Sequence, residues 1–327
     1  MISKVFNAAR WRVKALLERG LRPRQAAILM YHRIARPGDD DVWDLCVTPE
    51  HFQAQLEVMK RRGPILPLGE LLRKLDDGTL PRGASAITFD DGYLDNATAA
   101  LPILEAMDAP ATIFVASADV GRGTAFWWDR LISWQGDRAS LPGPIRLSSP
   151  SAARDWTDEE ERARSREGLN QSLWEWLAPL PNEERDARIT DLEQQAGRSD
   201  RNRPPPPLLA PDDVARLAAH ELIEIGGHTA THPHLSWLSA KEQRAEIQGS
   251  REALETWTNR PVTGFSYPFG NHNQDSQRIL RDLGFRYATA NVFDTLTARS
   301  DRFALPRLYA RNLDADGFAK EVFWRAG

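Results

Sequence analysis

Two adjacent carboxylates interrupt the stretch ITFDDGYLDN, residues 87–96, where an apolar segment of strand length ends. Two like charges beside a hydrophobic core are costly unless a cation binds them or water solvates them. Asp90 and Asp91 therefore indicate either a metal site or a solvated turn. Gly92 follows them and permits a sharp exit of the chain.

A group of histidines follows a second apolar segment, in IEIGGHTATHPHLS, residues 223–236. Three of the seven histidines of the chain, His228, His232 and His234, fall within seven residues. Two imidazoles and one carboxylate form a ligand set that leaves a position open on Zn²⁺ or a similar divalent ion. Each motif alone is weak evidence for a metal site, but together the two motifs predict one in which one aspartate is a ligand and the other is a general base.

The expected secondary structure places both motifs at one edge of a sheet. Short apolar strands alternate with helical patterns from residue 26 onward, which predicts an α/β fold with a mostly parallel sheet, open or closed into a barrel. In such folds the functional residues lie at the carboxyl ends of the strands. The predicted strands are 26–32, 85–89, 111–116, 222–227, 263–268, 287–290 and 304–310, and the predicted helices are 48–63, 67–76, 97–107, 211–219, 239–258, 274–283 and 314–324.

Residues 124–210 break this alternation. They contain six of the eleven tryptophans and close with the extended connector RPPPPLL, residues 203–209. We expect a helical insertion within a single domain at 26–327. The pair Trp127-Trp128 fits the buried core of this insertion better than an exposed face for stacking on a ligand.

Composition and the N-terminus restrict the partners. A net charge of −4 gives no reason to expect nucleic acid, and the single Cys46 excludes an internal disulfide and fits a reducing, cytoplasmic environment. Residues 1–25 carry seven basic side chains against one acid, with apolar residues on one helical face. This basic amphipathic helix predicts either peripheral contact of residues 1–24 with the inner membrane face or packing on the domain.

The motifs resemble those of the polysaccharide deacetylase family, which shares the NodB homology domain. TFDDG (88–92) is similar to the first motif of that family, HTATH (228–232) to the second and YPFG (267–270) to the third. The resemblance covers roughly residues 26–310. It implies a distorted (β/α) barrel and metal-dependent hydrolysis of an N-acetyl, or occasionally an O-acetyl, group on a saccharide.

The resemblance also implies roles for particular residues. Asp90 is the general base, and Asp91, His228 and His232 hold one divalent ion, with Zn²⁺ favoured by the imidazole ligands. The backbone N–H of Phe269 helps to stabilise the oxyanion. His234 is expected to be a structural neighbour of the site and not a ligand.

The sequence departs from the family pattern at two places. The third motif usually carries an arginine two residues before its proline, where Ser266 stands here, and the late stretch LPRLYARN (305–312) lacks the usual acid histidine. MYHRI (30–34) resembles the N-terminal segment of poly-N-acetylglucosamine deacetylases, which predicts His32 as the general acid. We expect Arg307 to supply the missing guanidinium beside Asp90.

These departures leave a second function open. A glycan-binding pseudoenzyme of the same fold would also lack the usual arginine and histidine, although the retained Asp90 argues against it. A polysaccharide, an oligosaccharide and a lipid-linked glycan precursor all stay open as the substrate.

Overall fold

The structure is a computed structural model that describes residues 25–38, 41, 43–123, 125–133, 145–153, 155–157, 166–195 and 205–323. The chain divides into two compact units. The first comprises the described residues of 1–37, 43–122 and 208–327, and the second those of 38–42 and 123–207. The predicted N-terminal helix at 1–25 lies, apart from Gln25, outside the described residues, so membrane contact through it stays a prediction.

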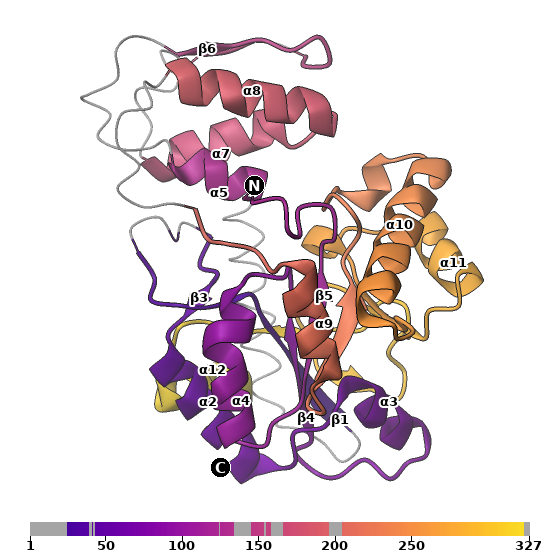
Figure 1. Ribbon diagram of the computed structural model, residues 1–327. Coiled ribbons are helices and arrows are strands. Elements are labelled where there is room, and N and C mark those ends of the chain that lie inside the picture. Colours follow the sequence, from indigo (N-terminus) through magenta and orange to yellow (C-terminus); the bar gives the residue numbers. More distant parts are fainter. Residues whose placement is uncertain are drawn as a thin grey trace. The chain divides into compact units, whose positions relative to one another are not determined.

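The first unit is built on a curled, mostly parallel sheet (Figure 1). The strand order is β10-β9-β8-β5-β4-β1-β11, and β12 also pairs with β1. Every pairing is parallel except that between β1 and β11. The strands are β1 (Gln25–Tyr31), β4 (Ser85–Phe89), β5 (Ala111–Val115), β8 (Ile223–Gly227), β9 (Gly264–Ser266), β10 (Tyr287–Thr289), β11 (Leu296–Thr297) and β12 (Leu308–Tyr309).

A C-terminal segment connects the two sides of this sheet. Leu305 bridges to Thr289 of β10, and Leu308 then pairs with Leu29 of β1. The segment thus connects β10, at one end of the strand order, with β1 and curls the sheet into a barrel, which confirms the predicted fold class. Arg307 lies between Leu305 and Leu308 in the sequence, so the segment that closes the barrel also positions Arg307.

The inside of the barrel is filled by one face of the strands. Ala26, Ile28, Ala86, Phe114 and Tyr287 form a buried cluster with the leucines of helix α3 (Leu68–Asp76). Two glycines make room for the large rings: a Cβ on Gly226 would clash with the ring of Phe114, and one on Gly264 with that of Tyr287.

Apart from α3, the helices of the first unit bury their apolar faces against the outside of the sheet. Helix α2 begins as predicted, with the Thr48 hydroxyl accepting from the His51 N–H and a proline at the first helical position. Helix α10 packs against α9 and α11 (Figure 1). Besides α3, the helices and helical turns of this unit are α2 (Pro49–Arg62), the π-helical turn η1 (Asn96–Ala100), α4 (Leu101–Ala106), α9 (Pro211–Ala219), η3 (Leu235–Trp237), α10 (Ala240–Thr258), η4 (Pro268–Gly270), α11 (Gln274–Asp282) and α12 (Ala315–Phe323).

The second unit holds most of the segment predicted as an insertion. It contains helices α5 (Trp127–Ser133), α7 (Arg166–Leu177) and α8 (Asn182–Gln195). It also contains a short antiparallel pair, β6 (Arg146–Leu147) and β7 (Trp156–Thr157), which the helical pattern did not predict. Trp127 and Trp128 are both buried, as expected for its core. Among the described helices of the whole chain, none is long and apolar enough to cross a membrane.

A half-buried carboxyl on β8 makes stability depend on pH. Glu224 accepts hydrogen bonds from the Tyr287 hydroxyl at 3.0 Å and the Thr112 hydroxyl at 3.5 Å. Burial raises the pKa of Glu224 above its usual value, an effect that these hydrogen bonds only partly oppose. A carboxyl with a raised folded-state pKa lowers stability as the pH rises from the unfolded pKa through the folded one, because the buried form must then ionise.

We therefore expect Glu224→Gln, which keeps an acceptor for Tyr287, to melt about 2 °C higher than the wild type at pH 8. The gain should shrink toward pH 5, where the wild-type carboxyl is protonated to a larger extent. Thermal melts of both proteins at the two pH values test this. A variant that melts below the wild type at pH 8 would show that the ionised carboxylate is stabilising.

Candidate functional site

The two aspartates occupy the sharp turn at the end of β4. The Asp90 N–H donates to the carbonyl of Tyr31, which extends the pairing with β1 by one step. Asp91 and Gly92 then adopt φ values of 79° and 92°, in the left-handed region that non-glycine residues rarely adopt. Both carboxylates are buried, and they contact different partners. The turn therefore gives each carboxylate a separate environment.

The histidines occupy a tight loop after β8. His228 follows the strand directly, and Thr229 and His232 have φ values of 64° and 57°. The Thr229 hydroxyl accepts the N–H of His232 at 3.0 Å. The carboxylate of Glu246 on α10 accepts the N–H groups of Ala230 at 3.0 Å and Thr231 at 2.8 Å. These acceptors satisfy the N–H groups that the loop geometry would leave unpaired.

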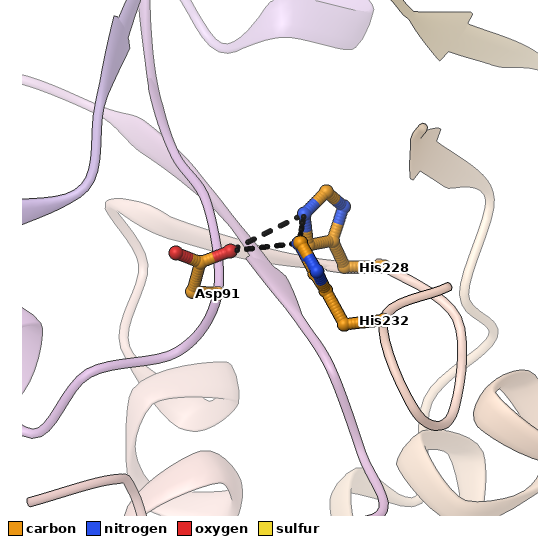
Figure 2. A group of neighbouring side chains, drawn as sticks. All are labelled: Asp91, His228 and His232. Carbon is orange, nitrogen blue, oxygen red and sulfur yellow. Dashed lines mark hydrogen bonds and ion pairs between the residues drawn. The ribbon is translucent and has the colours of Figure 1, made fainter. Parts of the chain in front are cut away.

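One aspartate and two histidines converge at the barrel end (Figure 2). The Asp91 Oδ1 atom lies 3.4 Å from His228 Nε2 and 3.2 Å from His232 Nε2. The two Nε2 atoms are 3.1 Å apart. All three side chains are buried, and the candidate ligand atoms lie within 4.8 Å of one another. The sequence predicted this grouping as the metal-ligand set.

The protonation states of these groups suit a cation. His228 Nδ1 lies 2.8 Å from the carbonyl oxygen of Ser266, so it carries the proton and leaves the Nε2 lone pair facing Asp91. Burial lowers the pKa of His232, which favours its neutral form. Burial opposes ionisation of Asp91, but hydrogen bonds from imidazole nitrogens of His228 and His232 that carry a proton outweigh burial and hold the pKa of Asp91 well below the usual range, and a bound cation would take the place of those protons. Lone pairs and a negative charge thus converge on one point, and a divalent ion bound by imidazole and carboxylate fits this donor set.

Asp90 is held by a buried arginine. Arg307 Nη1 donates to Asp90 Oδ1 and Nη2 donates to Oδ2, both at 2.7 Å. The Ser266 hydroxyl donates to Oδ2 at 3.2 Å and accepts from Arg307 Nη2 at 3.0 Å. Burial opposes ionisation of Asp90, but the charge and hydrogen bonds of Arg307 outweigh burial and lower the pKa of Asp90. The expected guanidinium therefore lies beside Asp90, next to the serine that replaces the usual arginine.

His32 follows β1 at the same end of the barrel. Its backbone carbonyl accepts the side-chain N–H of Asn96 at 2.8 Å, and its ring centroid lies 5.8 Å from that of Tyr309. Burial lowers the pKa of His32, while the charges of Asp91 and Asp90 act in the opposite direction. Its Nδ1 atom is buried and has no hydrogen-bond partner among the described residues. His32 thus lies within electrostatic reach of both aspartates, and its role as an acid stays a prediction.

Phe269 and His234 form the rim of the site. Phe269 has a φ of 57° inside η4, and its ring lies edge-on to His232 with the centroids 4.6 Å apart. The His234 ring stacks on Phe269 at 4.1 Å and is not a member of the ligand group. This is consistent with a structural place for His234. The use of the Phe269 N–H as an oxyanion donor stays a prediction.

Some supporting residues had no signal in the sequence. Glu246 is an ordinary glutamate of an amphipathic helix, and only the fold brings it to the histidine loop. Asn291, in the loop after β10, accepts from Arg307 Nη2 at 3.1 Å. The Asp95 carboxylate accepts from the Arg33 side chain at 3.0 Å and the Ile34 N–H at 3.1 Å, and so fixes the segment after His32. Each of these contacts joins residues 14 or more positions apart, so local pattern does not reveal them.

Comparisons with known proteins show the family and agree with the fold. A family model described as polysaccharide deacetylase matches residues 77–170 and 181–288. YxkH of Bacillus subtilis is 19% identical over 289 residues, which is 88% of this chain and 72% of that protein.

Two solved structures share the fold. The Streptococcus pyogenes deacetylase PplD, solved in complex with acetate, aligns with a TM-score of 0.61 and 19% identity over 92% of this chain and 99% of its own. A de-N-acetylase from Aggregatibacter actinomycetemcomitans aligns with a TM-score of 0.55 and 14% identity over 91% of this chain and 100% of its own.

Proposed function

The chain belongs to the polysaccharide deacetylase family, and from this premise we propose that it is a metal-dependent hydrolase that removes an N-acetyl group from a saccharide. The observation that carries the proposal is the pair of neighbouring carboxylates in separate environments. Asp91 lies with two imidazoles, and Asp90 is held ionised by Arg307. A ligand carboxylate beside a second carboxylate that stays ionised and off the metal suits metal-assisted hydrolysis of an amide.

Asp91, His228 and His232 would hold the ion, which we propose to be Zn²⁺. When bound, it would act as a Lewis acid toward the acetyl carbonyl and make water a better nucleophile at neutral pH.

The chain's own groups supply the proton transfers. Asp90 takes a proton from the attacking water, while Arg307 and Ser266 keep its carboxylate in one orientation. The N–H of Phe269 stabilises the negative charge that develops on the acetyl oxygen. His32 passes a proton to the leaving amine and must be an imidazolium to do so; burial lowers its pKa and disfavours that form, while the charges of Asp91 and Asp90 favour it.

Metal removal tests the proposal. We expect the purified chain to bind about one divalent ion, and chelator-treated protein to release no acetate until Zn²⁺ is restored. The measurements are elemental analysis and acetate release from β-1,4- and β-1,6-linked N-acetylglucosamine oligomers. A wild type that stays empty after Zn²⁺ is added would contradict the metal site. A metal-loaded chain that binds saccharides without releasing acetate would favour the glycan-binding pseudoenzyme.

A cytoplasmic location and membrane contact through residues 1–24 are further proposals that rest on the sequence alone. Seven basic side chains near an anionic leaflet would favour binding by about 1 kcal/mol each. Co-sedimentation with anionic liposomes, comparing the full chain with a chain that begins at Gln25, tests the contact. Equal sedimentation of the two would remove the argument for a lipid-linked substrate.

A further inference from the structure

Two large hydrophobic side chains are exposed in the described part of the chain. They are Trp237, which is 55% exposed, and Val292, which is 48% exposed. Both belong to loops that border the candidate site. Trp237 ends the η3 turn that follows the histidine loop, and Val292 follows Asn291, whose side chain contacts Arg307. Scattered exposed hydrophobics are normal, but Trp237 is a large aromatic ring whose contacts lead to the candidate site.

A continuous stack of rings connects Trp237 to the metal-ligand group. The indole stacks on His234 with a centroid distance of 3.9 Å and an angle of 23°. His234 stacks in turn on Phe269 at 4.1 Å and 15°, and Phe269 meets His232 edge-on at 4.6 Å. The exposed aromatic ring is therefore separated from a candidate metal ligand by two intervening rings.

The backbone under the indole is fixed. The N–H of Ser236 donates to the Asn271 side chain at 2.7 Å, and the N–H of Trp237 donates to the carbonyl of His234 at 3.0 Å. Leu235, inside the same turn, is fully buried in the core. An aromatic side chain held on such a turn is preorganised, so a ligand that stacks on it loses less conformational entropy on binding.

We propose that Trp237 is a stacking platform for the sugar ring that neighbours the acetylated ring in the substrate. The inference rests on the proposed function and adds that the substrate is longer than one sugar. The apolar C–H face of a neutral pyranose is the chemical surface that packs on an exposed indole. The platform is continuous with the catalytic rim through His234 and Phe269, so a saccharide chain entering the site passes over it. Trp237 thus determines preference for oligomers and takes no part in the chemistry.

The test compares an oligomer with a monosaccharide. The probes are β-1,4- and β-1,6-linked tetramers of N-acetylglucosamine and free N-acetylglucosamine, with acetate release as the readout. We expect the ratio of kcat/KM on the better tetramer to kcat/KM on the monosaccharide to fall about five- to tenfold in Trp237→Ala, mainly through KM. Trp237→Phe should retain part of the ratio. Lys241→Ala, an exposed change four residues away, should leave it unchanged.

Direct binding separates this inference from the proposed function. If the wild type releases no acetate, isothermal titration calorimetry with the tetramers still measures their binding affinity. Trp237→Ala should then weaken this affinity by a similar factor to the one expected for the kcat/KM ratio. Equal ratios and equal binding in the wild type and Trp237→Ala would overturn the inference, as would a wild type that binds neither tetramer. Concentration-dependent dimerisation that Trp237→Ala abolishes would assign the indole to self-association and overturn it as well. Thermal melts establish that the variants are folded.

Discussion

Replacing Asp90 with asparagine is expected to reduce acetate release by about 10²- to 10⁴-fold while leaving the metal content unchanged. Asparagine has nearly the shape of aspartate, so it can still lie between Arg307 and Ser266, but it cannot take a proton from water. Asp90 also lies outside the group formed by Asp91, His228 and His232. Acetate release and elemental analysis on the same preparations measure the two properties separately.

The matched variant is His228→Ala, in which a candidate ligand is removed and the general base is kept. It should lose both the metal and the activity. Loss of metal from Asp90→Asn would instead make Asp90 a ligand, and unchanged activity in that variant would make its carboxylate structural and the chain a pseudoenzyme candidate. Asp90→Asn leaves the buried Arg307 without its counter-charge, which costs about 3–5 kcal/mol. Activity must therefore be measured below the lowered melting temperature.

The main elements of the fold could be predicted from sequence because their signals are local. The buried parallel strands are short continuous apolar runs, and six of the seven predicted ranges begin within one residue of the observed strand. Helix α2 carries its own start signal in Thr48 and Pro49. The strand expected at 304–310 is reduced to β12, because Leu305 pairs with β10 before Leu308 pairs with β1. That division is a property of barrel closure, which no local pattern encodes.

Except for β12, the two-residue strands were not predicted. β2 (Arg33–Ile34), β3 (Cys46–Val47) and β11 are too short to show any periodicity, and tertiary contacts define them. β2 depends on Asp95, whose carboxylate makes no cap hydrogen bond to the next helix and binds Arg33. Short polar side chains can serve either purpose, and only the position of the neighbouring strand end decides between them.

The candidate site was predictable where its chemistry is carried by adjacent residues. Asp90, Asp91, His228 and His232 lie in two short motifs after strands, so their residue types indicate a metal site, while the role of each residue was implied by the resemblance to the family. Glu246 was missed because its role depends on the packing of α10 against the histidine loop. Arg307 could be expected only because the usual arginine position holds Ser266, which leaves a buried carboxylate that needs a cation.

Arg307→Ala should lower kcat/KM by about 10²-fold, because Asp90 loses the two hydrogen bonds that fix its orientation. It should also change the pH profile. Burial alone raises the pKa of Asp90, and the Arg307 charge reverses this, so removing that charge lets the pKa rise. The pH below which activity falls should therefore move upward. Arg307→Lys should not restore the wild type, since an ammonium cannot donate in the bidentate geometry of a guanidinium.

The double variant Ser266→Arg with Arg307→Ala tests whether the guanidinium or its place in the chain is what matters. Ser266 Oγ lies 3.2 Å from Asp90 and 3.0 Å from Arg307, so an arginine at 266 can enter the volume that the alanine vacates. We expect this variant to recover most of the lost kcat/KM and to return the acid limb of the profile toward lower pH. Recovery of melting temperature without recovery of the pH profile would assign Arg307 to stability alone. Recovery of neither would mean that Arg307 acts through Asn291 and the closing segment of the barrel, and not through the charge it brings to Asp90.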